Sequence, residues 1–278
     1  MTNFVFQQVD VFTSEPLRGN PLAVVVGADS LTEGQMASFA KWTNLSETTF
    51  LLQPTDPLAD YRVRIFTPQQ ELPFAGHPTL GTCHAWLTTG GVPQGEEIMQ
   101  ECEIGLVRIR RRDNLLSFAA PPLRRSGAVE PDILARAIEG LRLPLEAIVT
   151  ANWVDNGPGW LAVLLRNRHE VLAIEPDYTV LSGLRVGVVG PWSLEIDGQN
   201  AQFEVRAFTA AGFEDPVTGS LNAGLAQWLI SSGIAPPRYI ASQGTILGRS
   251  GRVHVERDGA ETWIGGAVTT CISGTVTL

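Results

Sequence analysis

Two segments of this chain carry the same pattern of residues. Residues 63–81 hold Val-Arg-x-Phe-Thr and then Glu-x-Pro-x-x-Gly-His-x-x-x-Gly, and residues 205–224 repeat this order with Ser in place of His. Val63 and Val205 are 142 positions apart, whereas Glu71 and Glu214 are 143 positions apart, so the later copy has one extra residue in the turn between its motifs. Duplication of a half-domain is the simplest cause, and it predicts two halves of similar structure.

In each copy, the residues favour a strand, a turn and then the start of a helix. Val, Phe and Thr favour strands, whereas Pro and Gly interrupt them. Apolar residues then recur at helical spacing: Leu80, Cys83 and Leu87 in the first copy, and Leu221, Leu225, Trp228 and Leu229 in the second. Pro78 suits a first helical turn, because its missing N–H would have no partner there. Gly76-His77 and Gly219-Ser220 are therefore predicted to lie at helix N-termini.

A helix N-terminus presents free backbone N–H groups and the positive end of the peptide dipoles, and glycine allows a ligand to approach the backbone. Two such ends related by duplication predict one cleft for a negatively charged ligand, bounded by Gly76-His77 and Gly219-Ser220. The alternative for either copy alone is an ordinary buried helix whose glycines only permit close packing. The repetition favours the binding site.

The composition limits the kind of ligand. The chain has 278 residues, 44% of them hydrophobic, a net charge of −9 and a pI near 5.0. This acidity argues against nucleic acid and against an anionic membrane as partners. An acidic chain that binds an acid must do so through a local site, and the predicted small-molecule partner is a carboxylate.

The three cysteines, Cys83, Cys102 and Cys271, are an odd number without CxxC spacing, so neither a disulfide framework nor a thiolate zinc site is expected. His77 and His84 share a predicted helix with Cys83 but have no carboxylate partner, so no metal is expected.

The chain contains no serine hydrolase motif, Walker A loop or Rossmann glycine motif, and no cofactor is expected. Its start lacks a secretory signal and no run is long enough to span a membrane, which predicts a cytoplasmic protein.

Local patterns predict further elements near the N-terminus. Residues 4–12 and 22–26 are strand-like and flank a Gly19-Asn20-Pro21 turn, which predicts a hairpin with a longer loop. Thr32 with Gln35 fits a capping box for a helix over about residues 33–43. Glu47 then stands at the head of a strand that runs through residues 50–52.

The linker at residues 121–127, rich in Pro and Arg, divides the chain. We expect a first lobe over residues 1–119, a second lobe over 120–265 with a helix beginning at Pro131, and a final strand over about 266–278 that returns to the first lobe. The repeated helices carry many small residues and must be enclosed. The predicted fold is therefore α+β, with two pseudo-symmetric lobes that each wrap a curved, mostly antiparallel sheet around a central helix.

Four motifs, spread in order from the N-terminus to about residue 230, together resemble the phenazine biosynthesis PhzF-like family. They are Asp10-Val11-Phe12 with Gly19-Asn20-Pro21, Asn44-Leu45-Ser46-Glu47-Thr48, Leu72-Pro73-Phe74-Ala75-Gly76-His77-Pro78-Thr79, and Glu214-Asp215-Pro216-Val217-Thr218-Gly219-Ser220. The family is similar to diaminopimelate epimerase, so the resemblance implies the same two-lobed fold that the repeat predicts. It also implies a homodimer.

The resemblance further implies a cofactor-free isomerase that moves a proton between two ring carbons of trans-2,3-dihydro-3-hydroxyanthranilate. Glu47 matches the family's proton-transferring glutamate. The residues expected to bind substrate, the two glycines through their backbone donors, are Asn20, Gly76, His77, Asp215, Gly219 and Ser220. The two opposed cysteines of the related epimerases would align with Ala75 and Thr218, so two-base racemisation is not expected. The resemblance does not identify the ring that this chain binds.

Each of these residues also has an ordinary structural interpretation. Glu47 is then a solvated carboxylate at a strand end, whereas catalysis would require burial that brings its pKa nearer neutrality than the usual value of about 4.3. Asp215 and Ser220 are then helix caps, His77 satisfies local backbone groups, and Asn20 is a turn residue. The corresponding alternative function is a catalytically silent protein that binds a carboxylate metabolite or a partner in the same cleft.

Overall fold

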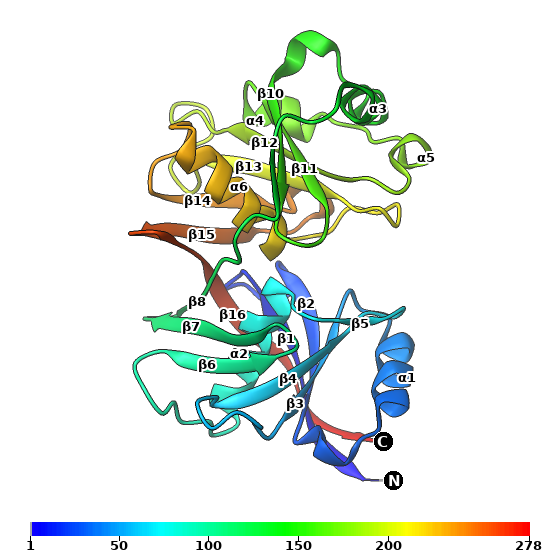
Figure 1. Cartoon of the computed structure of the whole chain (residues 1–278), viewed down its shortest axis with the longest axis vertical. Coiled ribbons are helices and arrows are strands. Elements are labelled where there is room, and N and C mark those ends of the chain that lie inside the picture. The colour runs from blue at the N-terminus through cyan, green and yellow to red at the C-terminus, as the bar shows by residue number, and fades with distance from the viewer. Residues whose placement is uncertain (1) are drawn as a thin grey trace. The chain divides into compact units, whose positions relative to one another are not determined.

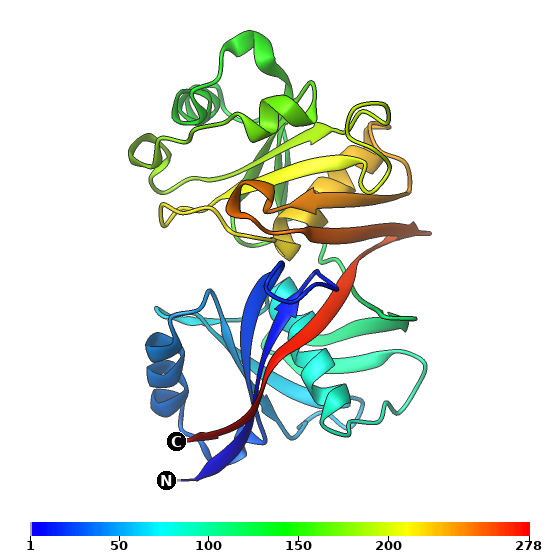
Figure 2. The ribbon, with the colours of Figure 1, turned by 180° about the vertical axis from the view of Figure 1, so that it is seen from behind.

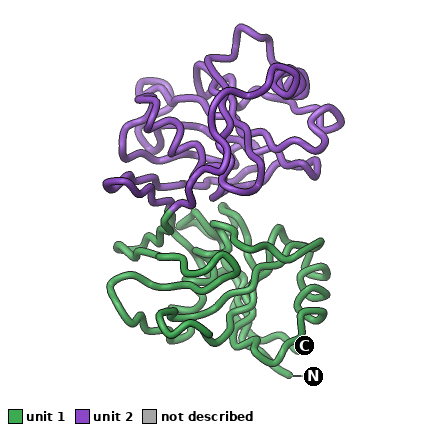
Figure 3. The backbone as a smooth tube through the Cα atoms, in the orientation of Figure 1, with its two compact units in different colours: residues 1–119, 265–278 green, residues 120–264 purple. Residues whose placement is uncertain are grey.

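The computed structural model describes residues 2–278, and these fall into two compact units (Figure 3). The first unit consists of the residues up to Ala119 together with Gly265–Leu278, and the second is Ala120–Ile264. Each unit is built from strands around one central helix, α2 (Gly76–Thr88) in the first and α6 (Gly219–Ser231) in the second (Figure 1). The mixed α and β composition and the predominance of antiparallel strand pairs agree with the prediction from the sequence.

The sheet of the first unit is closed. Its strands follow the order β1-β2-β3-β4-β6-β7-β8-β16, and β16 pairs with β1 from Asn3↔Thr277 to Val11↔Val268 (Figure 2). The short strand β5 pairs only with β4. The bounds are β1 Asn3–Val11, β2 Asn20–Val26, β3 Thr48–Leu52, β4 Tyr61–Phe66, β5 Glu71–Leu72, β6 Ile98–Cys102, β7 Gly105–Arg112, β8 Leu115–Ala119 and β16 Glu261–Thr277.

The predicted N-terminal hairpin and capping box are both confirmed. Strands β1 and β2 pair antiparallel. Helix α1 spans Glu33–Thr43, the Thr32 side chain accepts from the Gln35 backbone N–H, and the Gln35 side chain accepts from the Thr32 N–H at 2.9 Å. Met36, Phe39 and Ala40 of α1 pack with apolar residues of the sheet, whereas α2 contacts β1, β2, β3, β4 and β8.

The second unit continues from the start of β16 in the order β16-β15-β14-β13-β12-β11-β10-β9. Its strands are β9 Arg125–Gly127, β10 Ile148–Asp155, β11 Trp160–Leu165, β12 Arg185–Pro191, β13 Phe203–Phe208, β14 Arg238–Gln243 and β15 Gly251–Asp258. Besides α6, its helices are α3 Pro131–Leu141, α4 Arg168–Leu172 and α5 Tyr178–Leu181. Short 3₁₀ turns lie at Ala28–Ser30 in the first unit and at Leu145–Ala147 and Thr245–Leu247 in the second.

The strand pairings of the two units match one another, as a duplication requires. Strands β2 and β3 are parallel, like β11 and β12, and β4 and β6 are parallel, like β13 and β14. The intervening pairs β3–β4 and β12–β13 are antiparallel. The extra residue of the second copy lies in the predicted turn, since Thr67 N–H donates to Gln70 O whereas Thr209 N–H donates to Phe213 O. The repeat in the sequence is therefore a repeat in structure.

One glycine in each central helix sets how closely the helix packs against the sheet. A Cβ added at Gly81 would lie 2.5 Å from Leu22 Cδ2, and one added at Gly224 would lie 2.1 Å from the Val154 carbonyl oxygen. Real Cβ atoms do not approach other atoms so closely, so a side chain at Gly224 would collide with the Val154 backbone, whereas one at Gly81 would require the Leu22 side chain to shift. For Gly81 and Gly224, close packing is therefore the function of the repeated glycine.

The repeated arginine and glutamate form a bidentate ion pair in each unit. Arg64 donates to Glu71 at 2.7 and 2.5 Å, and Arg206 donates to Glu214 at 3.0 and 2.8 Å. Each pair ties the end of a strand to the segment that leads into the central helix. The second pair is the more buried, with 3% and 4% of the two side chains exposed, and Arg206 also donates to the Val171 and Ile174 carbonyls.

We expect Glu214→Gln to destabilise the protein by about 3–5 kcal/mol, because it leaves the Arg206 guanidinium buried without its counter-charge. Glu256→Gln is the matched control, since Glu256 pairs with the largely exposed Arg238, and it should cost less than about 1 kcal/mol. Urea unfolding of both variants and the wild type measures the difference. Equal losses in the two variants would contradict the assignment of the buried pair as a structural clamp.

Candidate functional site

In the first unit, three predicted site residues lie together at the N-terminus of α2. Glu47 directly precedes β3, His77 is the second residue of α2, and Asn20 begins β2. The Oε2 atom of Glu47 lies 3.4 Å from Nε2 of His77, and Nδ2 of Asn20 lies 3.5 Å from Nδ1 of the same ring. The side chain of Glu47 is 17% exposed and that of His77 is 6% exposed. Glu47 is thus a mostly buried carboxylate beside an imidazole, not a solvated group at a strand end.

The imidazole of His77 is neutral at ordinary pH. Burial lowers its pKa from 6.5 to about 3, and a hydrogen bond to the Pro21 backbone opposes this shift only in part. A neutral ring has one donor and one acceptor nitrogen. Glu47 therefore faces a hydrogen-bonding group that carries no fixed positive charge.

In the second unit, Ser220 occupies the position that His77 has in the first. It is the second residue of α6, its hydroxyl oxygen accepts from Trp160 Nε1 at 3.0 Å, and its carbonyl accepts from Asn156 Nδ2 at 2.9 Å. Because the indole can only donate, the Ser220 hydroxyl keeps its own hydrogen for donation elsewhere. Its side chain is fixed by a neighbouring strand and does not cap α6, which has no side-chain cap.

Asp215 lies just before α6 and is held through its backbone and its side chain. Its N–H donates to Ala207 O at 2.9 Å, and its carbonyl accepts from Gln243 Nε2 at 3.1 Å. Its Oδ2 accepts from the hydroxyl of Thr218 at 2.5 Å. Thr218 is the residue that precedes α6, and its own N–H donates to Gln243 Oε1 at 3.0 Å.

The predicted positions at the helix N-termini are confirmed, since Gly76 and Gly219 are the first residues of α2 and α6 and neither helix has a side-chain cap. Glu47, His77 and Asn20 come together in the first unit, and Asp215 and Ser220 gather at the start of α6 in the second. The substrate-binding roles of these residues, and a single cleft that uses both groups, stay predictions. Asn20 is fully buried and contacts His77, which gives it a partner within the protein.

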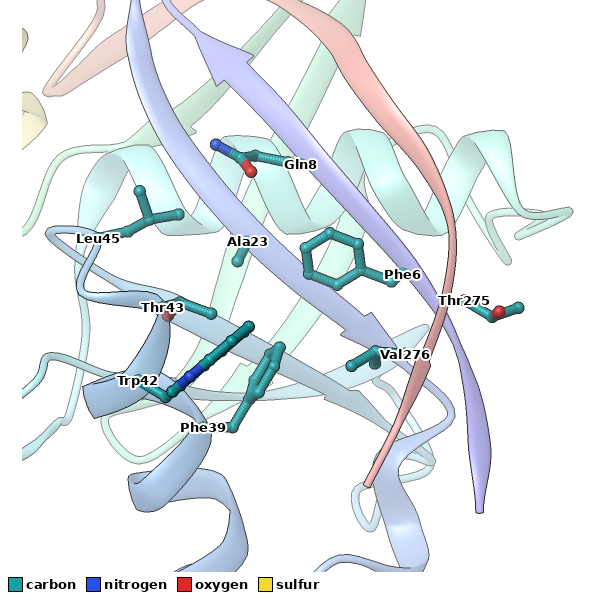
Figure 4. A pocket seen from close by; sticks show the side chains of 9 residues that line it. All are labelled: Phe6, Gln8, Ala23, Phe39, Trp42, Thr43, Leu45, Thr275 and Val276. Atoms are coloured by element: carbon teal, nitrogen blue, oxygen red, sulfur yellow. The ribbon is translucent and has the colours of Figure 1, made fainter. Parts of the chain in front are cut away.

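A cavity of about 380 Å³ lies between α1 and strands β1, β2 and β16 (Figure 4). Its lining is mostly apolar and contains none of the predicted site residues: Phe6, Gln8, Ala23, Phe39, Trp42, Thr43, Leu45, Thr275 and Val276. The figure shows the rings of Phe39 and Trp42 on one side of this space and Gln8 on another. Glu47, His77 and Asn20 are therefore not part of the lining of this cavity.

Two of the three thiols are buried, and no metal-binding cluster forms in the described part of the chain. Cys83 is fully buried in α2, and burial raises the pKa of its thiol to about 12. The pKa of Cys102 is also raised by burial. Within residues 2–278, no three His, Cys, Asp or Glu side chains converge as a metal site requires. No helix among these residues is long and apolar enough to cross a membrane.

The sequence analysis missed Gln243, Trp160 and Asn156. Their contacts to the start of α6 span 25, 60 and 64 positions, so no local pattern indicates them. For Gln243 a signal did exist: Gln100 stands 143 positions earlier, in step with the second repeated motif, and both side chains are fully buried.

The comparisons with known proteins agree on one family. The model of the family described as phenazine biosynthesis-like protein, PhzC-PhzF, matches residues 9–274. A Schizosaccharomyces pombe protein named antisense-enhancing sequence 1 is 37% identical, and the match covers 99% of both chains. A trans-2,3-dihydro-3-hydroxyanthranilate isomerase of Pseudomonas aeruginosa is 32% identical, with 91% of this chain and 90% of that protein covered. An uncharacterized isomerase of Pasteurella multocida is also 32% identical, covering 96% and 92%.

Solved structures show the same relationship. A PhzF family protein from Enterococcus faecalis superposes with a TM-score of 0.82 and 26% identity over the whole of both chains. A hydroxyproline epimerase from Agrobacterium vitis reaches a TM-score of 0.61 at 17% identity, covering 99% of this chain and 92% of that one, and so shares the fold. The chain therefore belongs to the phenazine biosynthesis-like family, PhzC-PhzF, and is an isomerase.

Proposed function

We propose that this isomerase shifts a proton between two carbons of a small cyclic carboxylate similar to trans-2,3-dihydro-3-hydroxyanthranilate, without a cofactor. The observation that carries the proposal is the mostly buried Glu47 carboxylate, with Oε2 placed 3.4 Å from Nε2 of the neutral His77. The substrate class comes from the isomerase of Pseudomonas aeruginosa, which matches over nine-tenths of both chains. The lack of side-chain caps at Gly76 and Gly219 supports binding of an anion, because the first N–H groups of a helix need partners.

In this mechanism, Glu47 acts first as a base and then as an acid. Its carboxylate takes the proton from one ring carbon while the electron pair of that C–H bond moves into the conjugated system. The resulting carboxylic acid returns the proton to another carbon on the same face, so the substrate is isomerised and the enzyme regains its original form. The neutral state of His77 suits this cycle, because an imidazolium beside Glu47 would favour the carboxylate and oppose return of the proton.

Asp215 and Ser220 are proposed as substrate ligands. Asp215 would accept a hydrogen bond from the substrate amine, and the Ser220 hydroxyl would donate to the substrate carboxylate together with the first N–H groups of α6. Incubation with trans-2,3-dihydro-3-hydroxyanthranilate in deuterated water tests the proposed substrate by NMR. Conversion supports the proposal, whereas a change of the ligand's signals without conversion would show that this ring is bound but is not the substrate.

We expect Glu47→Gln to lower kcat by about 10²–10⁴-fold while substrate affinity is retained, because the amide keeps the size of the side chain but cannot accept the proton. Glu139→Gln, on the exposed face of α3, is the control and should leave kcat unchanged. Steady-state kinetics and equilibrium binding of both folded variants provide the comparison. Turnover of Glu47→Gln within a few-fold of wild type would show that another group carries the proton.

We also expect catalysis without a thiol. Cys83 is buried and its thiol pKa is raised, so iodoacetamide should leave both the native protein's Cys83 and its turnover unchanged. Cys83→Ala should retain kcat within about twofold, with a loss of stability of about 1 kcal/mol from the lost packing. Mass spectrometry of the alkylated protein and kinetics of the variant test this. Loss of turnover in a folded Cys83→Ala protein would contradict it.

The buried neutral His77 predicts a dependence of stability on pH. Between pH 6.5 and about 3, the unfolded chain binds a proton at this residue and the folded protein does not, so stability falls as the pH falls through this window. The contribution of His77 should decrease by roughly 2 kcal/mol between pH 6.5 and 5. His77→Gln should remove this part of the slope, whereas His84→Gln should remove less, since the His84 ring is only half-buried and its pKa is lowered less. Equal slopes in wild type and His77→Gln, measured by urea unfolding at each pH, would refute the neutral ring.

A further inference from the structure

We propose that Gln243 and Thr218 are positioning residues that orient the Asp215 carboxylate toward a substrate amine, through hydrogen bonds whose direction the backbone fixes. The inference rests on the proposed role of Asp215 as a ligand of the substrate amine. It concerns only residues of the second unit, at the start of α6.

The side-chain amide of Gln243 has one allowed orientation. It is fully buried, and its Oε1 accepts from the Thr218 backbone N–H at 3.0 Å and from Asn222 Nδ2 at 2.8 Å. Its Nε2 donates to the Asp215 carbonyl at 3.1 Å and to the Thr218 hydroxyl oxygen at 3.0 Å. A backbone N–H only donates and a carbonyl only accepts, so a reversed amide would set donor against donor and acceptor against acceptor. Two backbone groups thus determine the orientation of Gln243.

This orientation in turn determines the hydroxyl of Thr218. Since the oxygen accepts from Gln243, its single hydrogen is available for the Asp215 Oδ2 atom, 2.5 Å away. Hydrogen bonds to a carboxylate stabilise the ionised form and restrict rotation of the group. The hydrogen bonds from Gln243 through Thr218 therefore fix the orientation of the Asp215 carboxylate. That arrangement suits a protonated or neutral amine, which donates, and not a second carboxylate.

The first unit offers an internal comparison. Gln100, 143 positions before Gln243, is also fully buried; its Oε1 accepts from the Tyr61 hydroxyl at 3.1 Å and its Nε2 donates to Thr79 Oγ1 at 3.0 Å. The residue before α2 is Ala75, which has no hydroxyl, and the position equivalent to Asp215 is Leu72. Both halves thus use the buried glutamine to support the central helix. Only the second half extends this support to a carboxylate.

The test compares two ligands that differ in the amine alone, 3-hydroxyanthranilate and 3-hydroxybenzoate, by isothermal titration calorimetry. Thr218→Val should raise the Kd of 3-hydroxyanthranilate about tenfold, the usual effect of one hydrogen bond to a charged group. It should leave the Kd of 3-hydroxybenzoate within about twofold. Thr218→Ser, which keeps the hydroxyl, should restore the wild-type values. In an Asp215→Asn background, Thr218→Val should have no further effect.

Gln243→Leu and Gln100→Leu form a matched pair, because each removes a buried amide at an equivalent position. Both should lower stability, but only Gln243→Leu should weaken 3-hydroxyanthranilate selectively. Equal weakening of the two ligands in Thr218→Val, or the same ligand preference in both leucine variants, would show a purely structural role and overturn the proposal.

A measurement without ligand separates failure of this inference from failure of the proposed function. The carboxyl carbon of Asp215 is titrated by NMR in wild type and in Thr218→Val. The proposal expects the midpoint to move to higher pH in the variant, because the donor that favours the ionised form is gone. An unchanged midpoint contradicts the proposed hydrogen bonds from Gln243 through Thr218 to Asp215, whether or not either ligand binds. If the midpoint moves and wild type binds neither ligand, the positioning holds and the assigned substrate is wrong.

Discussion

The burial of one helix on all sides is the constraint on which each half of this protein depends. Helices α2 and α6 are small or apolar on several faces, and most of their residues are buried. Such a helix is stable only if the sheet curves around it. Gly81 and Gly224 make this possible, because a side chain there would displace Leu22 in one unit or collide with the Val154 backbone in the other. The predicted site residues lie at the N-terminal end of each enclosed helix.

The duplication kept this scaffold and changed the chemistry at the helix ends. The ion pairs Arg64–Glu71 and Arg206–Glu214 fix the approach to each helix in the same way. At the helix starts the copies diverge: Ala75, His77 and Thr79 in the first correspond to Thr218, Ser220 and Asn222 in the second. The first half therefore offers an imidazole next to Glu47, and the second offers the Thr218 hydroxyl next to Asp215. The residues that the two copies share support the central helices, and the residues that differ place different chemical groups at the helix starts.

Much of the scaffold could be predicted from the sequence, because the signals were local. The repeat, the helix starts at Gly76 and Gly219, and the Thr32–Gln35 capping box depend on residues a few positions apart. The parallel pairing of β2 with β3 and of β11 with β12 was not predicted, since strands that pair across a long connection leave no local pattern. The partners of Ser220 and Asp215 were not predicted either, because Trp160 and Gln243, which donate these hydrogen bonds, lie far away in the sequence. The Arg–Glu pairs are a different case. Both residues of each pair belong to the repeated motifs, so the sequence already showed them at equivalent positions in the two copies.

The contact between Glu47 and His77 is compatible with the proposed use of one carboxylate as both base and acid. A group that both takes and returns a proton must be tolerated as an anion and as a neutral acid. A permanent cation would favour the anion, whereas an apolar wall would favour the acid. His77 is neither, since burial keeps it uncharged while its ring retains one donor and one acceptor nitrogen, with the Asn20 amide and the Pro21 backbone beside it. Only Nε2 faces Glu47, so it meets the carboxylate as a donor in one tautomer and the acid as an acceptor in the other. The neutral histidine is thus compatible with both states through which Glu47 would pass in the proposed cycle.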